Sequence, residues 1–206
     1  MLSIGIGGNI GSGKTAVAKE LCKLCKKDGV RVNLLDADQT AWELYKRNAV
    51  SEKRSAVYDK IIKAFGTGVL DNKGEIDRKK LGKIVFNNRK ALQQLNMIVH
   101  PELIRQIKHE LRKFDGTIKI LDAALLFFWG KKIPVTYRVL VISPDKQKVV
   151  RMAKRGYNIK EVNSRLNQQM KESEMEKITD FVVNNNSTLN ELKNKVKYLY
   201  LILKEY

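Results

Sequence analysis

The stretch that decides the fold is Gly8-Asn9-Ile10-Gly11-Ser12-Gly13-Lys14-Thr15, near the start of a chain of 206 residues. It fits the pattern G-x-x-x-x-G-K-[ST] at every fixed position. An apolar segment precedes it, and residues 13–27 repeat apolar side chains at helical spacing. Glycines let the backbone curl so that N–H groups and the helix N-terminus point at phosphates. We therefore predict a strand, a phosphate-binding turn formed by all eight residues, and a helix.

Three side chains give this turn its chemistry. Lys14 is predicted to place a positive charge on the β- and γ-phosphates of a nucleotide, and Thr15 to offer a hydroxyl ligand to Mg²⁺. Asp122 ends the apolar run 118–121, a position from which a carboxylate meets Mg²⁺ directly or through water. The alternative is a glycine-rich turn that holds nothing, and the complete match in the right context disfavours it. The sequence predicts a site for a nucleoside triphosphate with Mg²⁺.

Strands and helices alternate along the rest of the chain. Further strands are predicted at residues 30–35, 118–122, 135–142 and 181–183, with helices between them and a capping box at Thr188-Leu-Asn-Glu191 that opens the last helix. Residues 41–114 read as mostly helical, with Asp77 as a helix N-cap and Pro101 at the start of a helix. The pattern predicts a three-layer α/β fold of the P-loop type, with a parallel sheet and an inserted helical lobe.

Other candidate residues admit more than one role. Asp36 and Asp38 follow the second strand, where one could hold and deprotonate an acceptor hydroxyl, or both could cap a helix. Arg151 and Arg155 lie one helical turn apart, and with Arg165 they could neutralise a transferring phosphoryl group or form a solvated cationic face. His100 precedes Pro101 at a predicted helix entry, where capping is the plainer interpretation.

The chain is strongly basic, with 40 Lys plus Arg against 22 Asp plus Glu and a formal net charge of +18. The cations are spread over nearly every segment, which favours a lysine-rich surface over binding to nucleic acid. Cys22 and Cys25 lie in the first helix without a second cysteine pair, so buried packing is preferred to redox or zinc chemistry. We see no export signal and no membrane-spanning run, and expect a cytoplasmic protein without an obligate protein partner. Its oligomeric state stays open.

Taken together, these segments resemble the dephospho-CoA kinase family of P-loop nucleoside and nucleotide kinases. The resemblance covers almost the whole chain. Besides the phosphate-binding turn, it is carried by Asp36-Ala-Asp38, Gly74-Glu-Ile-Asp-Arg78, His100-Pro101, the set Arg151, Arg155, Arg165 and Gln169, and Asp180 with Asn185. Two departures are Ala124 and Phe128, which stand where the family has proline and glutamate.

The resemblance implies that ATP phosphorylates the 3′-hydroxyl of the dephospho-CoA ribose, the last step of coenzyme A synthesis. It implies catalytic roles for Asp38, Lys14, Arg151 and Arg155, acceptor contacts from Asp38, His100 and Arg165, and Mg²⁺ organised by Thr15 and Asp122. One domain over residues 1–206 would carry an acceptor lobe at 58–114 and a helical lid at 144–178. A P-loop kinase for another hydroxyl acceptor is the main alternative, and a basic nucleotide-binding module that engages nucleic acid is a weaker one.

Overall fold

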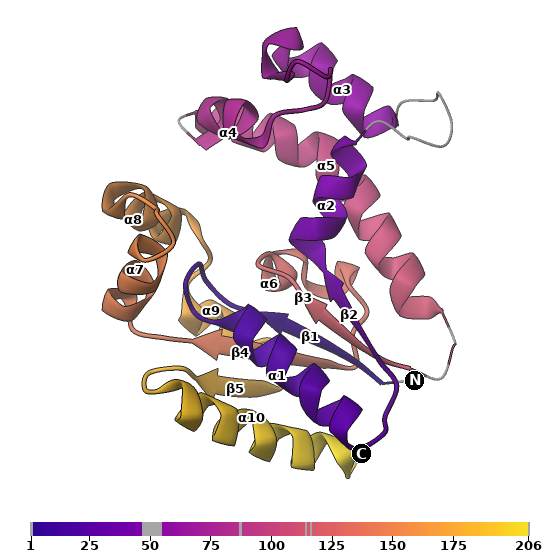
Figure 1. Ribbon diagram of the computed structural model, residues 1–206, viewed down its shortest axis with the longest axis vertical. Helices are drawn as coiled ribbons and strands as arrows, with labels where there is room; N and C mark the ends of the chain where they lie inside the picture. Colours follow the sequence, from indigo (N-terminus) through magenta and orange to yellow (C-terminus); the bar gives the residue numbers. More distant parts are fainter. Residues whose placement is uncertain (1, 47–54, 87, 114, 116, 206) are drawn as a thin grey trace. The chain divides into compact units, whose positions relative to one another are not determined.

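The computed structural model describes residues 2–46, 55–86, 88–113, 115 and 117–205 (Figure 1). The chain divides into two compact units. The first unit comprises Met1–Asp36 and Leu111–Tyr206, and the second comprises Ala37–Glu110. The second unit therefore starts at the first helical residue after Asp36, before residue 58, where the acceptor lobe was predicted to begin.

A parallel sheet of five strands forms the centre of the first unit (Figure 1). The strand order is β2-β3-β1-β4-β5, and all four neighbouring pairs are parallel. The bounds are β1 Ser3–Gly7, β2 Val32–Asp36, β3 Ile118–Asp122, β4 Tyr137–Ile142 and β5 Phe181–Asn184. The predicted three-layer α/β fold with a parallel sheet is confirmed, because helices cover both faces of the sheet.

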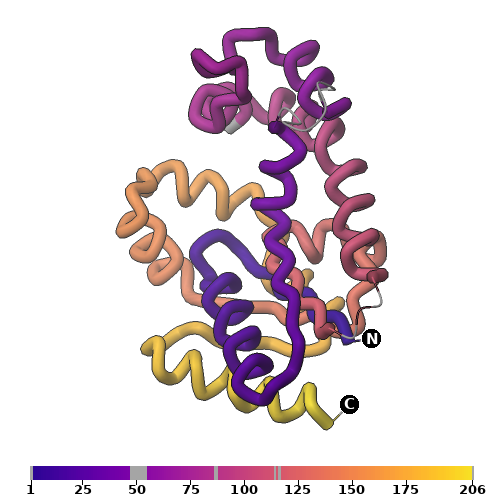
Figure 2. The backbone as a smooth tube through the Cα atoms, turned by 45° about the vertical axis from the view of Figure 1, so that its right-hand side comes forward, coloured from indigo at the N-terminus to yellow at the C-terminus, as the bar shows by residue number. Residues whose placement is uncertain are grey.

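The alternation of side chains along β1 explains the two covered faces. Ile4 and Ile6 are buried in the cluster that includes α1 (Lys14–Lys27) and α10 (Leu189–Lys204). Glycines 5 and 7 come close to α6 (Leu126–Trp129), since a Cβ atom on Gly7 would lie 2.6 Å from the Phe127 ring. Figures 1 and 2 both show α10 lying beside α1. The sheet is thus a packed layer between helices.

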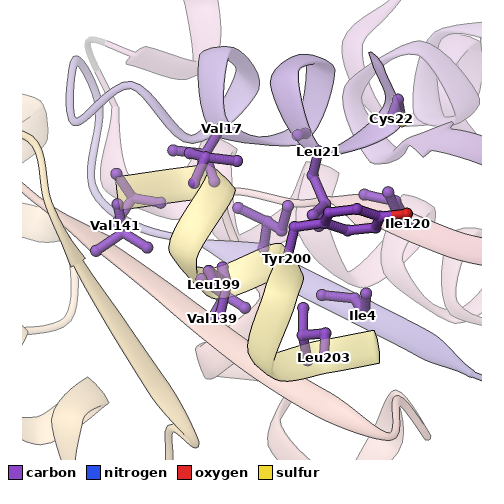
Figure 3. Close-up of a cluster of buried hydrophobic side chains, with 14 of the residues drawn as sticks. Ile4, Val17, Leu21, Cys22, Ile120, Val139, Val141, Leu199, Tyr200 and Leu203 are labelled. Atoms are coloured by element: carbon purple, nitrogen blue, oxygen red, sulfur yellow. The ribbon is translucent and has the colours of Figure 1, made fainter. Parts of the chain in front are cut away.

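A hydrophobic core of the first unit lies between the sheet and these two helices (Figure 3). Val17 and Leu21 of α1 meet Val196 and Leu199 of α10 within one buried cluster. Cys22 and Cys25 belong to the same cluster and are free thiols, as the packing interpretation predicted. Burial raises the pKa of Cys25 to about 11, so its thiol stays protonated at neutral pH.

Three helices connect β4 to β5, namely α7 (Asp145–Ala153), α8 (Ile159–Gln168) and α9 (Glu172–Glu176). Asn158 caps α8 by accepting a hydrogen bond from Lys160 N, and Thr188 caps α10 by accepting one from Glu191 N. The cap at Thr188 matches the predicted capping box. Lys148 of α7 is only 2% exposed and its Nζ lies 2.9 Å from Asp145 Oδ1 and 2.5 Å from Glu172 Oε1, so an ion pair ties α7 to α9.

The second unit is helical and contains α2 (Ala37–Tyr45), α3 (Ala56–Phe65), a 3₁₀ turn (Thr67–Val69), α4 (Arg78–Phe86) and most of α5 (Arg89–Arg112). Asp77 Oδ1 accepts hydrogen bonds from Lys79 N and Lys80 N, which confirms the predicted N-cap of α4. The prediction that a helix begins at Pro101 is wrong, because α5 runs through it. Buried side chains on both sides of the proline, Leu95, Val99, Leu103 and Ile107, hold the helix together.

Among the described residues, no helix combines the length and the apolar character that crossing a membrane requires.

Candidate functional site

The predicted phosphate-binding turn joins β1 to α1 in the first unit and is shaped by glycines. Gly8, Gly11 and Gly13 have φ angles of 148°, 73° and 100°, which L side chains rarely adopt. The turn is also tightly enclosed, since a Cβ atom on Gly8 would lie 2.4 Å from Val141 O and one on Gly13 would lie 2.2 Å from Asn185 Nδ2. Backbone conformation and close packing therefore both require glycine here.

The start of α1 fits an anionic ligand. Gly13 is the N-cap residue, and within the described chain no side chain caps this helix and its first turn holds no acidic residue. Lys14 and Thr15 are the first two helical residues and keep partial exposure. A helix N-terminus without a side-chain cap carries partial positive charge, and a lysine beside it adds a full one. The turn can thus hold phosphate groups, as the eight-residue pattern predicts.

Thr15 and Asp122 form the polar pair at the base of the turn. Thr15 Oγ1 donates a hydrogen bond to Asp122 Oδ2 at 2.6 Å, joining the start of α1 to the end of β3. Asp122 is 5% exposed and lies in register with Ile6 on β1 and Asp36 on β2. The carboxyl ends of three neighbouring strands therefore meet beside the turn, which is where open α/β sheets bind ligands.

This pair also fits a magnesium ion. A hydroxyl and a carboxylate are hard oxygen ligands, which Mg²⁺ prefers. The described residues contain no group of three or more His, Cys, Asp or Glu side chains that could hold a metal by themselves. Mg²⁺ in phosphate-transferring sites is usually held by one or two protein groups, substrate phosphates and water, and the donor set here suits that mode.

Arg151 holds the outer side of the turn. Its Nη1 donates to Gly11 O at 3.2 Å, to Ser12 O at 3.4 Å and to Ser143 Oγ at 2.9 Å. Its Nη2 donates to Gln147 Oε1 at 2.9 Å and to Asn185 O at 3.0 Å. Burial, and then the charge of Arg155, lower the pKa of this guanidinium. The side chain that the sequence suggested as catalytic thus contacts backbone carbonyls of the turn.

Two amide side chains complete this support. Asn185 is 6% exposed and its Nδ2 donates to Ser12 O at 2.7 Å. Gln169, directly after α8, accepts a hydrogen bond from Ile10 N at 2.9 Å. The turn is therefore fixed through Ile10, Gly11 and Ser12 by residues far along the chain. Sequence reasoning noticed Gln169 and Asn185 only as parts of a family pattern, and it missed Ser143 and Gln147.

The other arginines lie differently. Arg155 is exposed, two residues after the end of α7. Arg165 forms an ion pair with Glu161 at 2.7 Å, and its guanidinium lies 5.3 Å from the centre of the Tyr157 ring. Arg165 thus contacts Glu161 of its own helix and Tyr157 just before that helix, whereas Arg151 contacts the turn. Arg155 presents its charge to solvent.

Of the remaining candidates, Asp38 and His100 belong to the second unit, and Asp36 is the last residue before it. Asp38 is exposed in the first turn of α2, so the two aspartates do not share an extended segment, and Asp36 instead ends β2. Helix formation begins directly after Asp36, so Asp38 lies on a helix and Asp36 on a strand end. His100 is half buried inside α5, away from any helix start, and the interpretation of His100 as a capping residue is therefore wrong.

Comparison with known proteins decides the family. The family model described as dephospho-CoA kinase matches residues 2–191. The chain belongs to the dephospho-CoA kinase family. Its relatives include the dephospho-CoA kinases of Aquifex aeolicus, 34% identical with 97% of this chain and 96% of the relative covered, and of Fusobacterium nucleatum, 36% identical with 96% of both covered. A crystal structure of a Thermus thermophilus protein is similar with a TM-score of 0.72 at 32% identity, covering 98% of this chain and 97% of that one.

Membership in the dephospho-CoA kinase family confirms the resemblance predicted from the motifs, and with it a phosphotransferase. The turn at Gly8–Thr15 and the Thr15–Asp122 pair lie inside the matched residues. So do Arg151, Gln169 and Asn185, which hold the turn. The supported phosphate-binding turn is thus part of the region that defines the family.

Proposed function

We propose that this chain transfers the γ-phosphoryl group of ATP to the 3′-hydroxyl of the dephospho-CoA ribose, which gives coenzyme A and ADP. The observation that carries this proposal is the family match over nearly the whole chain. It is accompanied by 34% and 36% identity to two relatives that are named for this reaction. Kinase families of this kind use ATP as donor, and the phosphate-binding turn supplies the donor site. The reaction is the last step of coenzyme A synthesis.

Phosphoryl transfer places most of the catalytic demand on positioning and charge. Backbone N–H groups at the start of α1, which no side chain of the described residues caps, cradle the β- and γ-phosphates, and Lys14 neutralises part of their charge. Thr15 and Asp122 would hold Mg²⁺, which would supply positive charge beside the phosphates. Support of the turn by Arg151, Gln169 and Asn185 keeps these donors in one arrangement.

Asp38 is the proposed general base. Its carboxylate accepts the proton of the 3′-hydroxyl as the ribose oxygen attacks the γ-phosphorus and the bond to the ADP oxygen breaks. A positioned base of this kind contributes about 10²- to 10⁴-fold in rate. The location of Asp38 in the first turn of α2, two residues after the end of β2, supports the role.

Arg155 is the proposed transition-state cation. It is exposed on the segment from α7 to α9, which corresponds to the predicted lid, whereas Arg151 is engaged with the turn. An arginine delivered to the transferring phosphoryl group is worth about 10³- to 10⁵-fold in rate. His100 and Arg165 remain predicted acceptor contacts, and a cytoplasmic location remains a prediction.

An ADP-release assay with an acceptor panel tests the proposal. The panel contains dephospho-CoA, adenosine, uridine and pantetheine with ATP and Mg²⁺, and Asp38→Asn serves as the comparison variant. We expect ADP release to depend on dephospho-CoA and to fall at least about 10²-fold in the variant. Release that dephospho-CoA does not stimulate would refute the acceptor assignment. Near-full activity of Asp38→Asn would remove Asp38 as base and leave the substrate standing.

A further inference from the structure

Three side chains of α2 form one stripe on the second unit. Asp38, Trp42 and Tyr45 are spaced at i, i+4 and i+7, which places them on one helix face. Trp42 and Tyr45 pack edge to face, with ring centres 5.5 Å apart and planes at 80°. Tyr45 is therefore a lateral support for the indole ring, and the stripe starts at the proposed base.

Arg78 extends this stripe from a second helix. Its guanidinium carbon lies 4.4 Å from the centre of the Trp42 ring, within the range of a cation–π contact. Arg78 is exposed although it is stacked, because it opens α4 at the surface of the unit. The indole thus fixes the guanidinium of a residue that remains exposed to solvent.

The backbone before Arg78 is also fixed. Asp77 N donates to Val69 O at 2.8 Å, and Asp77 Oδ1 caps the following turn through Lys79 N and Lys80 N. Leu70 and Ile76 form an antiparallel bridge, and Asp71 Oδ1 accepts from Lys73 N and Glu75 N inside the turn between them. Arg78 is therefore held both at its backbone and at its guanidinium, so little freedom is lost when it binds an anion.

The charges at the two ends of the stripe both act on Tyr45. Burial raises the pKa of this phenol to about 12, Arg78 lowers it and Asp38 raises it. Both charges therefore lie close enough to the Tyr45 ring to affect the pKa of its hydroxyl. The four residues from Asp38 to Trp42 correspond to about 6 Å along the helix axis, a distance on the scale of a ribose phosphate.

We propose that Arg78, held by Trp42, binds the pyrophosphate of the acceptor while Asp38 holds its ribose hydroxyl. This inference rests on the proposed function and adds the group that selects a phosphate-bearing acceptor. Arginine suits this task because its planar fork donates two parallel hydrogen bonds to phosphate oxygens. Arg78 is a specificity-determining residue, and Trp42 is a positioning residue that acts through it.

Steady-state kinetics of matched variants test the assignment. The set is Arg78→Met, Arg78→Lys, Trp42→Leu, Trp42→Phe, the double variant Arg78→Met with Trp42→Leu, and the control Lys79→Met, which removes a neighbouring exposed cation. In Arg78→Met we expect the KM for dephospho-CoA to rise about 10- to 100-fold, with the KM for ATP within about twofold of the wild type. The KM of Arg78→Lys for dephospho-CoA should fall between those of the wild type and Arg78→Met. The KM values of Lys79→Met should match those of the wild type.

Trp42 has its own signature. Trp42→Leu should raise the KM for dephospho-CoA less than Arg78→Met does, and Trp42→Phe should restore most of the loss because a ring is kept. The double variant should be no worse than Arg78→Met alone, since residues that act as a unit are not additive. Additive losses would mean that Trp42 acts independently of Arg78 and would overturn its positioning role.

The failure of this inference differs from the failure of the proposed function. If the wild type does not turn over dephospho-CoA, the proposed function fails. If the wild type does, and Arg78→Met keeps its KM for dephospho-CoA, only the present assignment fails. A parallel rise of both KM values, with a lowered melting temperature, would also overturn it, because the variant would then disturb the unit as a whole.

Discussion

Asn185 Nδ2 donates a hydrogen bond to the carbonyl oxygen of Ser12 at 2.7 Å, although the two residues lie 173 positions apart. Ser12 belongs to the phosphate-binding turn, and Asn185 directly follows β5. The contact thus fixes the turn through a residue near the C-terminal end of the chain. It leaves the start of α1, which no side chain in the described part of the chain caps, outside this contact.

Asn185→Ala should destabilise the protein and weaken ATP binding together. The substitution leaves a buried carbonyl without this donor, which costs about 1–3 kcal/mol in the free energy of unfolding. Urea unfolding gives the stability, and titration with ATP gives the affinity. Asn184→Ala is the matched control, because Asn184 is the exposed neighbour on β5. Unchanged ATP affinity in Asn185→Ala would contradict a role in shaping the turn.

Substitutions of Arg151 and Arg155 should change different kinetic constants. Arg151→Met removes hydrogen bonds to Gly11 and Ser12, so we expect the KM for ATP to rise about tenfold or more, with the KM for dephospho-CoA little changed. Arg155→Met should leave both KM values near the wild type and lower kcat by about 10³-fold. The exchanged pattern, a kcat loss in Arg151→Met alone, would make Arg151 the transition-state cation.

Thr15→Ala should shift the dependence on magnesium. Removal of the hydroxyl that bonds Asp122 takes away one oxygen ligand, and we expect the Mg²⁺ concentration for half-maximal rate to rise about 10- to 100-fold. The measurement is the rate at saturating ATP over a range of free Mg²⁺. Thr15→Ser keeps the hydroxyl and serves as control. An unchanged Mg²⁺ profile in Thr15→Ala would exclude Thr15 as a ligand.

The free energy of unfolding should fall in strong alkali because Tyr200 ionises. Burial, and then a hydrogen bond to Asp28, raise the pKa of Tyr200 to about 12 from an ordinary value near 10. The folded state therefore keeps a proton that the unfolded chain releases, and this stabilisation is complete below about pH 10 and is lost up to about pH 12.

Tyr200→Phe removes this titration, so the free energy of unfolding should depend less on pH in that window than it does in the wild type. Urea unfolding at several pH values between 9 and 12 provides the measurement. Tyr198→Phe, on the exposed side of α10 at 69% exposure, is the control and should keep the wild-type dependence. An equal slope in Tyr200→Phe and the wild type would contradict the assignment.

The sequence predicted those parts of the fold that local chemistry determines. The strand, turn and helix around Lys14 followed from one pattern, and Asp77 and Thr188 cap helices as their types and spacing indicate. The prediction that a helix begins at Pro101 was wrong because buried side chains on both sides of it outweigh the local preference of proline for the start of a helix. Packing of that kind is not visible in a short window of sequence.

The site was predictable to the same degree. Thr15 and Asp122 meet as expected, because a strand end and a helix start determine both positions. The contact of Arg151 with the turn could not be predicted from the sequence, since its spacing to Arg155 suits a solvated cationic face as well as a side chain that binds the turn. Its acceptors on Gly11 and Ser12 lie about 140 positions away and are backbone atoms, which leave no residue signature.

The position of the transferred phosphate tests the central claim most directly. The wild-type chain is incubated with ATP labelled in its γ-phosphate and with dephospho-CoA, and the product is analysed by mass spectrometry and phosphorus NMR. The account predicts one labelled phosphate for each acceptor, on the ribose 3′-oxygen, and almost none with Asp38→Asn. ADP formed without labelled acceptor, or label at any other oxygen, would contradict it.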